Sequence, residues 1–148
     1  MNKKTAISKK ARRAAQIRRL MENHPGLTKK DAEFAVRTVI GLTHCAALFV
    51  STMTSNFHKR KGESIENFNH RVEHSAIREM MQNIIEQVGS FICANKDFRE
   101  VLKQDCKTFG QEDFTNKLFA DFVFDTFYGT EGVADCIESY CAAKVKKN

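Results

Sequence analysis

The stretch TVIGLTHCAALFVSTMTSNF, residues 38–57, contains no Asp, Glu, Lys or Arg, and it decides the fold. Around it, side chains of one set recur at alternating steps of three and four residues: Val36, Val39, Thr43, Ala46, Val50, Met53 and Phe57. This spacing places them on one face of an α-helix. Further apolar residues widen that face, so neighbouring helices must cover it on several sides. The stretch therefore predicts a long central helix buried in a helical core.

Residues on either side of this stretch indicate where the central helix begins and ends. Thr28 followed by Asp31 is typical of a capping box, and Pro25 and Gly26 break the chain just before it. After the apolar stretch comes the basic run 58–61, and Gly62 is suited to a helix stop. We therefore expect the helix to run from Thr28 to about Lys61.

The same stretch has to be weighed as a membrane span, because twenty uncharged residues match the thickness of a bilayer. Many of its residues are polar, however, and its last turns consist almost entirely of hydroxyl and amide side chains. Membrane insertion favours Leu, Ile, Phe and Val at the centre of the span, and this stretch holds few of them. We expect a buried helix and no membrane span.

The rest of the chain is also typical of helices. Seven Gly, one Pro and the lack of alternating β-branched runs favour an all-α fold over a sheet. A flexible basic tail is expected at residues 1–10, followed by a single helical domain at 11–148 with about six helices. They are expected at residues 11–23, 28–61, 64–93, about 95–106 and 111–128, with a last helix after the Gly129–Thr130 break. Ser64 and Asn95 are expected to cap two of them.

Positive charge is concentrated at the N-terminus. Residues 1–22 hold eight bases and one acid, a net charge of +7, whereas the remaining chain holds sixteen bases and seventeen acids, a net charge of −1. A segregated basic arm favours polyanion binding. The candidate phosphate-binding residues are Lys3, Lys4, Lys9, Lys10, Arg12, Arg13, Arg18, Arg19 and, after the central helix, Lys59, Arg60 and Lys61. No base-reading motif accompanies them, so binding would be non-specific. A solvated tail or a nuclear-import signal is the alternative.

A His-x-x-Glu-His motif occurs at His70, Glu73 and His74. On one helix the two imidazoles would lie one turn apart and could hold zinc, with the carboxylate as general base. Nothing in the sequence marks a third ligand, which a catalytic zinc site needs. We therefore predict no metal site, no cofactor and no enzymatic activity.

The chain has five cysteines, an odd number with no Cys-x-x-Cys spacing: Cys45, Cys93, Cys106, Cys136 and Cys141. No apolar signal segment is apparent. These features favour reduced thiols packed in the core of a protein of the cytoplasm or nucleus.

The order of elements up to about residue 76 resembles a histone fold. Ile17-x-Arg19-Leu20-Met21 is similar to the end of the first helix in archaeal histones and in the histone-fold subunits of polymerase and remodelling complexes. Leu27-Thr28 followed by Ala32 resembles their entry into the long helix. The segment 46–57, the basic run 59–61 and Ile65 resemble the end of that helix and the loop after it. The minimal fold has no counterpart to the chain beyond about Gln82. The resemblance implies DNA packaging and a dimer.

A second resemblance covers less of the chain. Leu27 to Glu33, with Ala35 and Val36, is similar to the helical hairpin of bacterial HU and IHF proteins. Those proteins continue into a Gly-rich sheet and DNA-gripping arms, which this sequence lacks, so the likeness stops at about Phe49. Both relatives are dimeric DNA-binding proteins.

Two functions follow from these patterns. The first is a small helical protein that binds DNA backbone non-specifically through its basic arm, as a homodimer or with a helical partner. The alternative is an interaction or regulatory protein. Its aromatic-rich helix between Phe114 and Phe127 would then meet a partner, although the last helix of the chain could cover the same rings.

Overall fold

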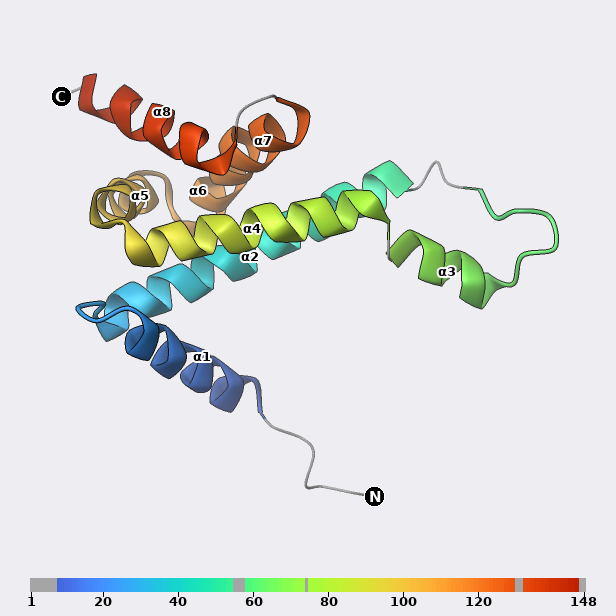
Figure 1. Cartoon of the computed structure of the whole chain (residues 1–148), viewed down its shortest axis with the longest axis horizontal. Coiled ribbons are helices and arrows are strands. Elements are labelled where there is room, and N and C mark those ends of the chain that lie inside the picture. Colours follow the sequence, from blue (N-terminus) through green and yellow to red (C-terminus); the bar gives the residue numbers. More distant parts are fainter. Residues whose placement is uncertain (1–7, 55–57, 74, 130–131, 147–148) are drawn as a thin grey trace.

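The computed structural model describes residues 8–54, 58–73, 75–129 and 132–146, and this part of the chain is helical without any β-strand (Figure 1). The elements, in order, are α1 (Lys9–Asn23), α2 (Lys29–Thr54), α3 (Ile65–Glu73), α4 (Ala76–Ala94), α5 (Lys96–Phe109), α6 (Gln111–Leu118), the π-helical segment η2 (Phe119–Phe124), α7 (Asp125–Tyr128) and α8 (Val133–Lys146). The prediction of an all-α chain is confirmed.

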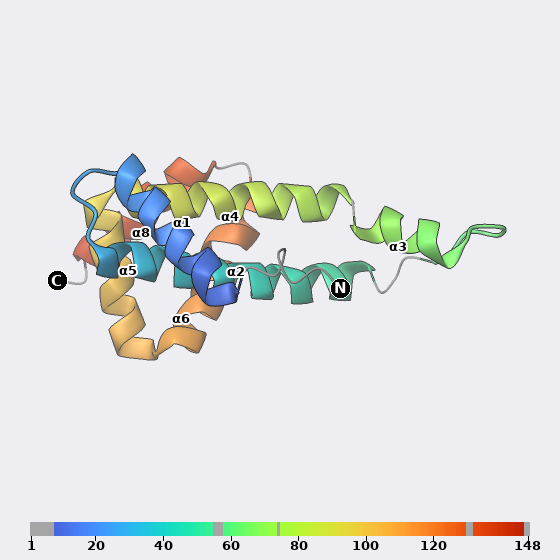
Figure 2. The same cartoon turned by 90° about the horizontal axis from the view of Figure 1, so that it is seen from below.

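The two longest helices, α2 and α4, lie antiparallel and form the middle of the molecule. Helices α5 to α8 cover one side of this pair, and α1 crosses the other side (Figures 1 and 2). The core between these layers contains the fully buried side chains Leu42, Val88, Ile92, Phe98, Leu102, Phe114, Leu118, Phe122 and Val123. Helix α2 therefore has the central position that its uncharged stretch predicts.

The start of α2 agrees with the sequence, whereas its predicted end does not. The Asp31 N–H donates to Thr28 Oγ1 at 3.1 Å. In the turn before, the Leu27 N–H donates to the His24 carbonyl, with Gly26 at φ +93°. At the other end, α2 is helical to Thr54, but residues 58–60 are irregular and Gly62, at φ +84°, belongs to a turn before α3. The prediction that the helix reaches Lys61 was therefore wrong. Phe57, which was expected on its apolar face, lies outside the described residues.

The expected helix 64–93 is two helices, because the chain changes direction at Ser75. This residue is extended, at φ −65° and ψ 149°, and its Oγ accepts from the Arg78 N–H at 3.4 Å as the N-cap of α4. A serine that caps a new helix competes with continuation of the old one. The expected caps of α3 and α5 are confirmed, since Ser64 Oγ accepts from the Asn67 N–H and Asn95 Oδ1 from the Phe98 N–H.

The aromatic residues of α6, η2 and α7 divide between two neighbours. Phe119 and Phe122 are buried. The Phe124 ring packs edge-on against Phe49 of α2, with ring centroids 4.9 Å apart, while Tyr140 of α8 lies 5.0 Å from Phe122. The last helix thus covers only part of the aromatic set, and α2 covers another part.

Two glycines allow helices to approach α2 closely. A Cβ at Gly41 would lie 2.5 Å from Thr115 Cγ2 of α6, and a Cβ at Gly89 of α4 would lie 2.8 Å from Val39 Cγ2. Thr115 is buried, and its hydroxyl donates to the Gln111 carbonyl at 2.7 Å. The α2–α6 contact therefore has no room for a methyl group.

We expect Gly41→Ala to lower the free energy of unfolding by about 1–2 kcal/mol, because overpacking against Thr115 outweighs the gain in helix propensity. Gly89→Ala serves as the matched comparison. Val39 is only partly buried, so it can shift, and the loss should be smaller. Urea unfolding of both variants measures the difference, and equal losses would contradict the packing argument.

An ion-pair cluster joins α2, α4 and α5 at one end of the molecule. Arg99 of α5 is buried, and its Nη1 donates to the carbonyl oxygens of Ile92 and Cys93, at 2.9 and 3.0 Å. Its Nε lies 3.6 Å from Asp31 Oδ2, and the Lys103 ammonium donates to Asp31 Oδ1. Burial would raise the pKa of Asp31, but the hydrogen bonds from Lys103 and Thr28 and the charges of Lys103 and Arg99 outweigh it, so this pKa lies below its usual value.

Asp31→Asn should lower the free energy of unfolding by about 3 kcal/mol at neutral pH, because it leaves the buried Arg99 without a counter-charge. The stabilisation by a carboxylate with a depressed pKa is complete above its unfolded pKa and is lost as pH falls through the folded one. The gap between wild type and variant should therefore close below about pH 4.

Denaturant unfolding at a series of pH values measures this gap. Glu100→Gln is the matched control, since Glu100 is an exposed partner of Lys103 at 3.8 Å and should cost less than about 0.5 kcal/mol. A gap of unchanged size at pH 3 would show that the Asp31 charge is not responsible.

Candidate nucleic-acid interface

Helix α1 is fixed to the body of the protein at its C-terminal end. Ser8 is its N-cap and accepts from the Ala11 N–H at 3.1 Å. Ile17 is buried and Leu20 packs against the core. Towards its N-terminus, by contrast, nearly all residues of α1 are exposed. The helix passes in front of α2 and α4 in Figure 2. The helix thus presents its N-terminal half to solvent.

The basic side chains of α1 are exposed and form no ion pair within the described part of the chain. These residues are Lys9, Lys10, Arg12, Arg13, Arg18 and Arg19. The ion pairs among the described residues involve only bases outside α1: Arg71, Arg99 and Lys103. The first turn of α1 has no acidic residue either, and the helix N-terminus adds its own partial positive charge. Lys3 and Lys4 lie outside the described residues.

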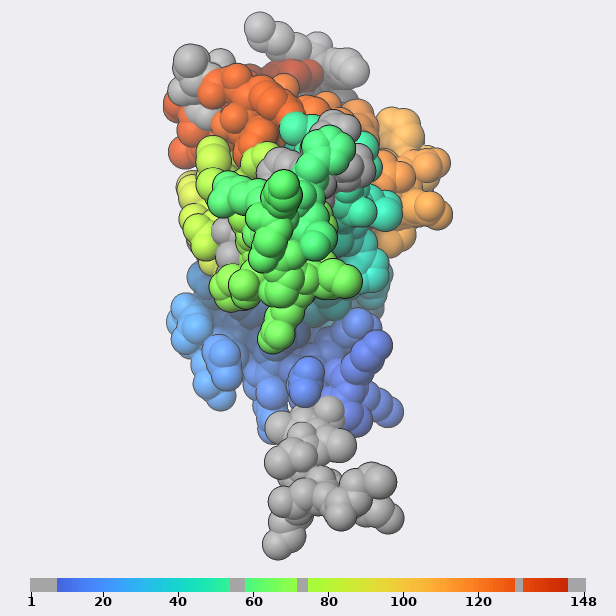
Figure 3. Space-filling model, turned by 90° about the vertical axis from the view of Figure 1, so that its right-hand side faces the viewer, coloured from blue at the N-terminus to red at the C-terminus, as the bar shows by residue number. Residues whose placement is uncertain are grey.

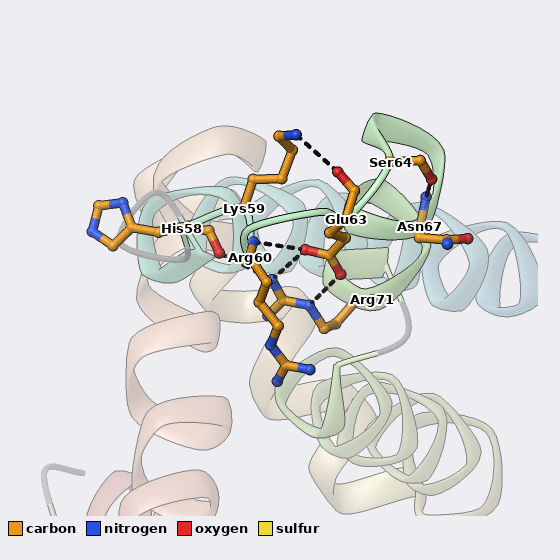
Figure 4. A network of polar contacts seen from close by, with 7 residues as sticks. All are labelled: His58, Lys59, Arg60, Glu63, Ser64, Asn67 and Arg71. Atoms are coloured by element: carbon orange, nitrogen blue, oxygen red, sulfur yellow. Dashed lines mark hydrogen bonds and ion pairs between the residues drawn. The ribbon is translucent and has the colours of Figure 1, made fainter.

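The second predicted group of bases, Lys59 to Lys61, lies in the loop before α3. In this loop Lys59 and Arg60 contact Glu63 (Figure 4). The Arg71 guanidinium donates to both carboxylate oxygens of Glu63, at 3.1 and 3.2 Å, and to the His58 carbonyl at 3.0 Å. The Arg60 N–H donates to the same carboxylate, and the Lys59 ammonium to the Glu63 carbonyl. The hydrogen bonds from the Arg71 side chain and then from the Arg60 N–H, with the charges of both residues, hold the pKa of Glu63 below its usual value. The loop keeps exposed bases, but a carboxylate lies among them.

The structure does not bring the two basic groups together. Helix α1 crosses the half of α2 that contains its N-terminus, whereas residues 58–63 lie beyond the opposite end of α2 (Figures 1 and 2). Sequence reasoning identified both groups and had no means to place them relative to each other.

The zinc motif divides at the end of α3. His70 is exposed on α3, which ends at Glu73, while the Glu73 side chain and His74 lie outside the described residues. The single helix 64–93 that was expected to carry both imidazoles is divided, because Ser75 is the N-cap of α4. Among the described residues, no group of three or more His, Cys, Asp or Glu side chains could hold a metal ion.

The cysteines are free thiols in packed surroundings. Cys93 and Cys136 are buried, and the other three are partly buried. Burial raises the pKa of the Cys45, Cys93 and Cys141 thiols, which lowers their thiolate fraction. The expectation that the cysteines pack as small core side chains agrees with this burial.

A groove between α2 and α4 was missed by sequence reasoning. Its volume is about 550 Å³, and its lining includes Ala46, Ala47, Val50, Met81 and Ile85. A smaller depression of about 340 Å³ adjoins it where α1 crosses, sharing Val39 and Glu86 with it. The signal in the sequence was the width of the apolar surface on α2, which exceeds what one neighbouring helix covers.

Among the described helices, the segment Lys29–Met53 of α2 is long and apolar enough to cross a bilayer. The central helix of a water-soluble protein can have the same length and composition. Comparison of the chain with family models, with curated proteins and with solved structures found no match.

Proposed function

We propose that this protein binds the phosphate backbone of nucleic acid, most simply double-stranded DNA, without sequence preference. Helix α1 and the basic tail before it would supply the contacts. One observation carries the proposal: the excess positive charge of the chain lies in residues 1–22, and the six bases on α1 are exposed without ion-pair partners among the described residues. When exposed bases pair with phosphates, they displace the cations condensed on the nucleic acid, and this release drives non-specific binding.

The proposal extends to a histone-fold-like first half followed by additional helices. The order and lengths of α1, α2 and α3, with fifteen, twenty-six and nine residues, support this likeness. Helix α4, which lies along α2, belongs to the part of the chain without a counterpart in the minimal histone fold. A protein of this kind would act by binding, without a catalytic step.

Arg12→Gln/Arg13→Gln should weaken DNA binding and reduce the steepness of its salt dependence. Each lost phosphate contact changes the slope of log K against log salt by about 0.9, so the double variant should lower it by about 2. Gel shifts or fluorescence anisotropy with a short duplex over a salt series measure both quantities. The same series with single-stranded RNA distinguishes a preference for DNA from general polyanion binding.

The matched control is Lys96→Gln/Lys107→Gln, which removes the same number of charges from exposed positions on α5. It should leave the slope nearly unchanged. Lys61→Gln tests the loop separately and should have the smaller effect, because this base is remote from α1. Equal effects of the α1 and α5 variants would show that binding depends on the net charge of the chain and not on the bases of α1.

A second candidate function is that of an interaction or regulatory protein, and the groove between α2 and α4 favours it. Outside the groove, two large apolar side chains are also exposed, Leu48 at 73% and Tyr128 at 58% of full exposure. A chain lacking residues 1–22 that no longer binds DNA but still binds a protein partner would separate this function from the first.

A further inference from the structure

Helix α3 has an apolar edge that no other described helix covers. It projects beyond the end of the α2/α4 pair and, within the described part of the chain, packs against no helix extensively (Figures 1 and 3). Ile65 is 69% exposed, and Phe68, three residues later on the same side, lies beneath the Arg71 guanidinium at 5.4 Å from its ring centroid. The Glu63–Arg71 ion pairs connect α3 to the loop before it rather than to the core.

The groove between α2 and α4 is an apolar surface that no other described helix fills. It lies on the α1 side of the molecule, and the residues that line it come from α2 and α4. Val50 and Met81 form part of its apolar floor, while Ala47 and Ser51 are exposed at its edge. Helix α1 covers the neighbouring depression but does not extend over this part.

The helix and the groove match in length. Nine residues of α3 span about 14 Å at the helical rise of 1.5 Å per residue. The groove extends from Val39 to Ser51 on α2 and from Arg78 to Glu86 on α4, which by the same rise corresponds to about 18 and 12 Å. A helix as long as α3 therefore fills the groove without projecting far beyond it.

We infer that two copies of this chain form a dimer in which α3 of each copy lies in the α2/α4 groove of the other. Because every copy carries both the projecting helix and the groove, a two-fold arrangement satisfies both at once and closes after two subunits. It also provides two contact areas per dimer, whereas an unrelated helix would fill one groove and leave α3 uncovered. Ile65 and Phe68 supply the apolar edge that enters the groove.

Charged residues at the groove and on α3 also favour α3 of a second copy as the occupant of the groove. Arg78 and Glu86 lie at the groove, and α3 carries Glu66 among its exposed residues, so the groove contains a base for the acid of the entering helix. Each copy has a net charge of +6, which opposes association at low ionic strength. Salt screens this repulsion, so dimerisation should strengthen with salt, while phosphate binding weakens. The inference does not depend on nucleic-acid binding, and this opposite response separates the two.

Sedimentation velocity of the full chain over a micromolar concentration series, at low and high salt, tests the dimer. We expect a monomer–dimer equilibrium. Ile65→Glu on the helix and Ala47→Glu on the groove should each raise the dimer dissociation constant by about a hundredfold, since each places an unpaired carboxylate in the apolar contact. Leu48→Glu is the matched control, next to Ala47 on α2, highly exposed and outside the groove, and should leave the constant unchanged.

Mixing the two variants makes the test specific for this geometry. A heterodimer of Ile65→Glu with Ala47→Glu keeps one intact contact, formed by the wild-type α3 of one chain and the wild-type groove of the other. The equimolar mixture should therefore associate more strongly than either variant alone. Circular dichroism with thermal unfolding confirms that all variants are folded.

Three outcomes would overturn the inference. The first is a wild-type chain that stays monomeric over the whole series, which would leave α3 to lie on its own chain or stay exposed. The second is a dimer that neither variant weakens. The third is a dimer weakened by both variants without recovery in the mixture, which would place the two residues in different contacts.

Discussion

The buried Arg99 guanidinium fixes how the two longest helices lie against each other. It donates to carbonyl oxygens at the C-terminal end of α4, and its Nε lies 3.6 Å from Asp31 in the first turn of α2. Because α2 and α4 are antiparallel, the partial positive end of one helix and the partial negative end of the other meet here. The acid on α2 and the base from α5 each compensate the helix end they contact. The register of α2 against α4, and so the position of the groove, depends on this cluster.

Local signals in the sequence predicted three helix starts correctly, whereas they did not predict the end of α2 or any long-range contact. The caps Thr28, Ser64 and Asn95 act on N–H groups three residues away, so a short window contains all the information they need. Asp31 and Lys103, by contrast, are 72 residues apart, and no pattern pairs them. The break at Ser75 was missed because the apolar spacing continues through it. The Ser75 cap divides the single helix that was expected over residues 64–93.

The chain uses its basic residues in two different ways. Arg71, Arg99 and Lys103 are engaged with Glu63 or Asp31 and hold the fold together. The bases of α1 form no ion pair among the described residues, and their mutual repulsion opposes a compact arrangement. Their charge was predictable from composition alone, but only the structure shows that nearby acids leave it uncompensated. A segment whose charge opposes its own folding needs another reason for that charge, and a polyanion would supply one.

Helix α2 is apolar round most of its circumference, so several helices must pack against it. The described helices cover its two halves to different extents. Helices α4 and α6 pack closely against it where Gly89 and Gly41 leave room, and α1 covers a third side. Helix α1 has only fifteen residues against twenty-six in α2, so the half of α2 nearer Thr54 lacks this third layer. The sequence predicted the need for several neighbours but not where cover would be missing. This half of α2 lies at the end of the molecule from which α3 projects. The groove and the projecting α3 therefore lie at the same end, which α1 is too short to reach.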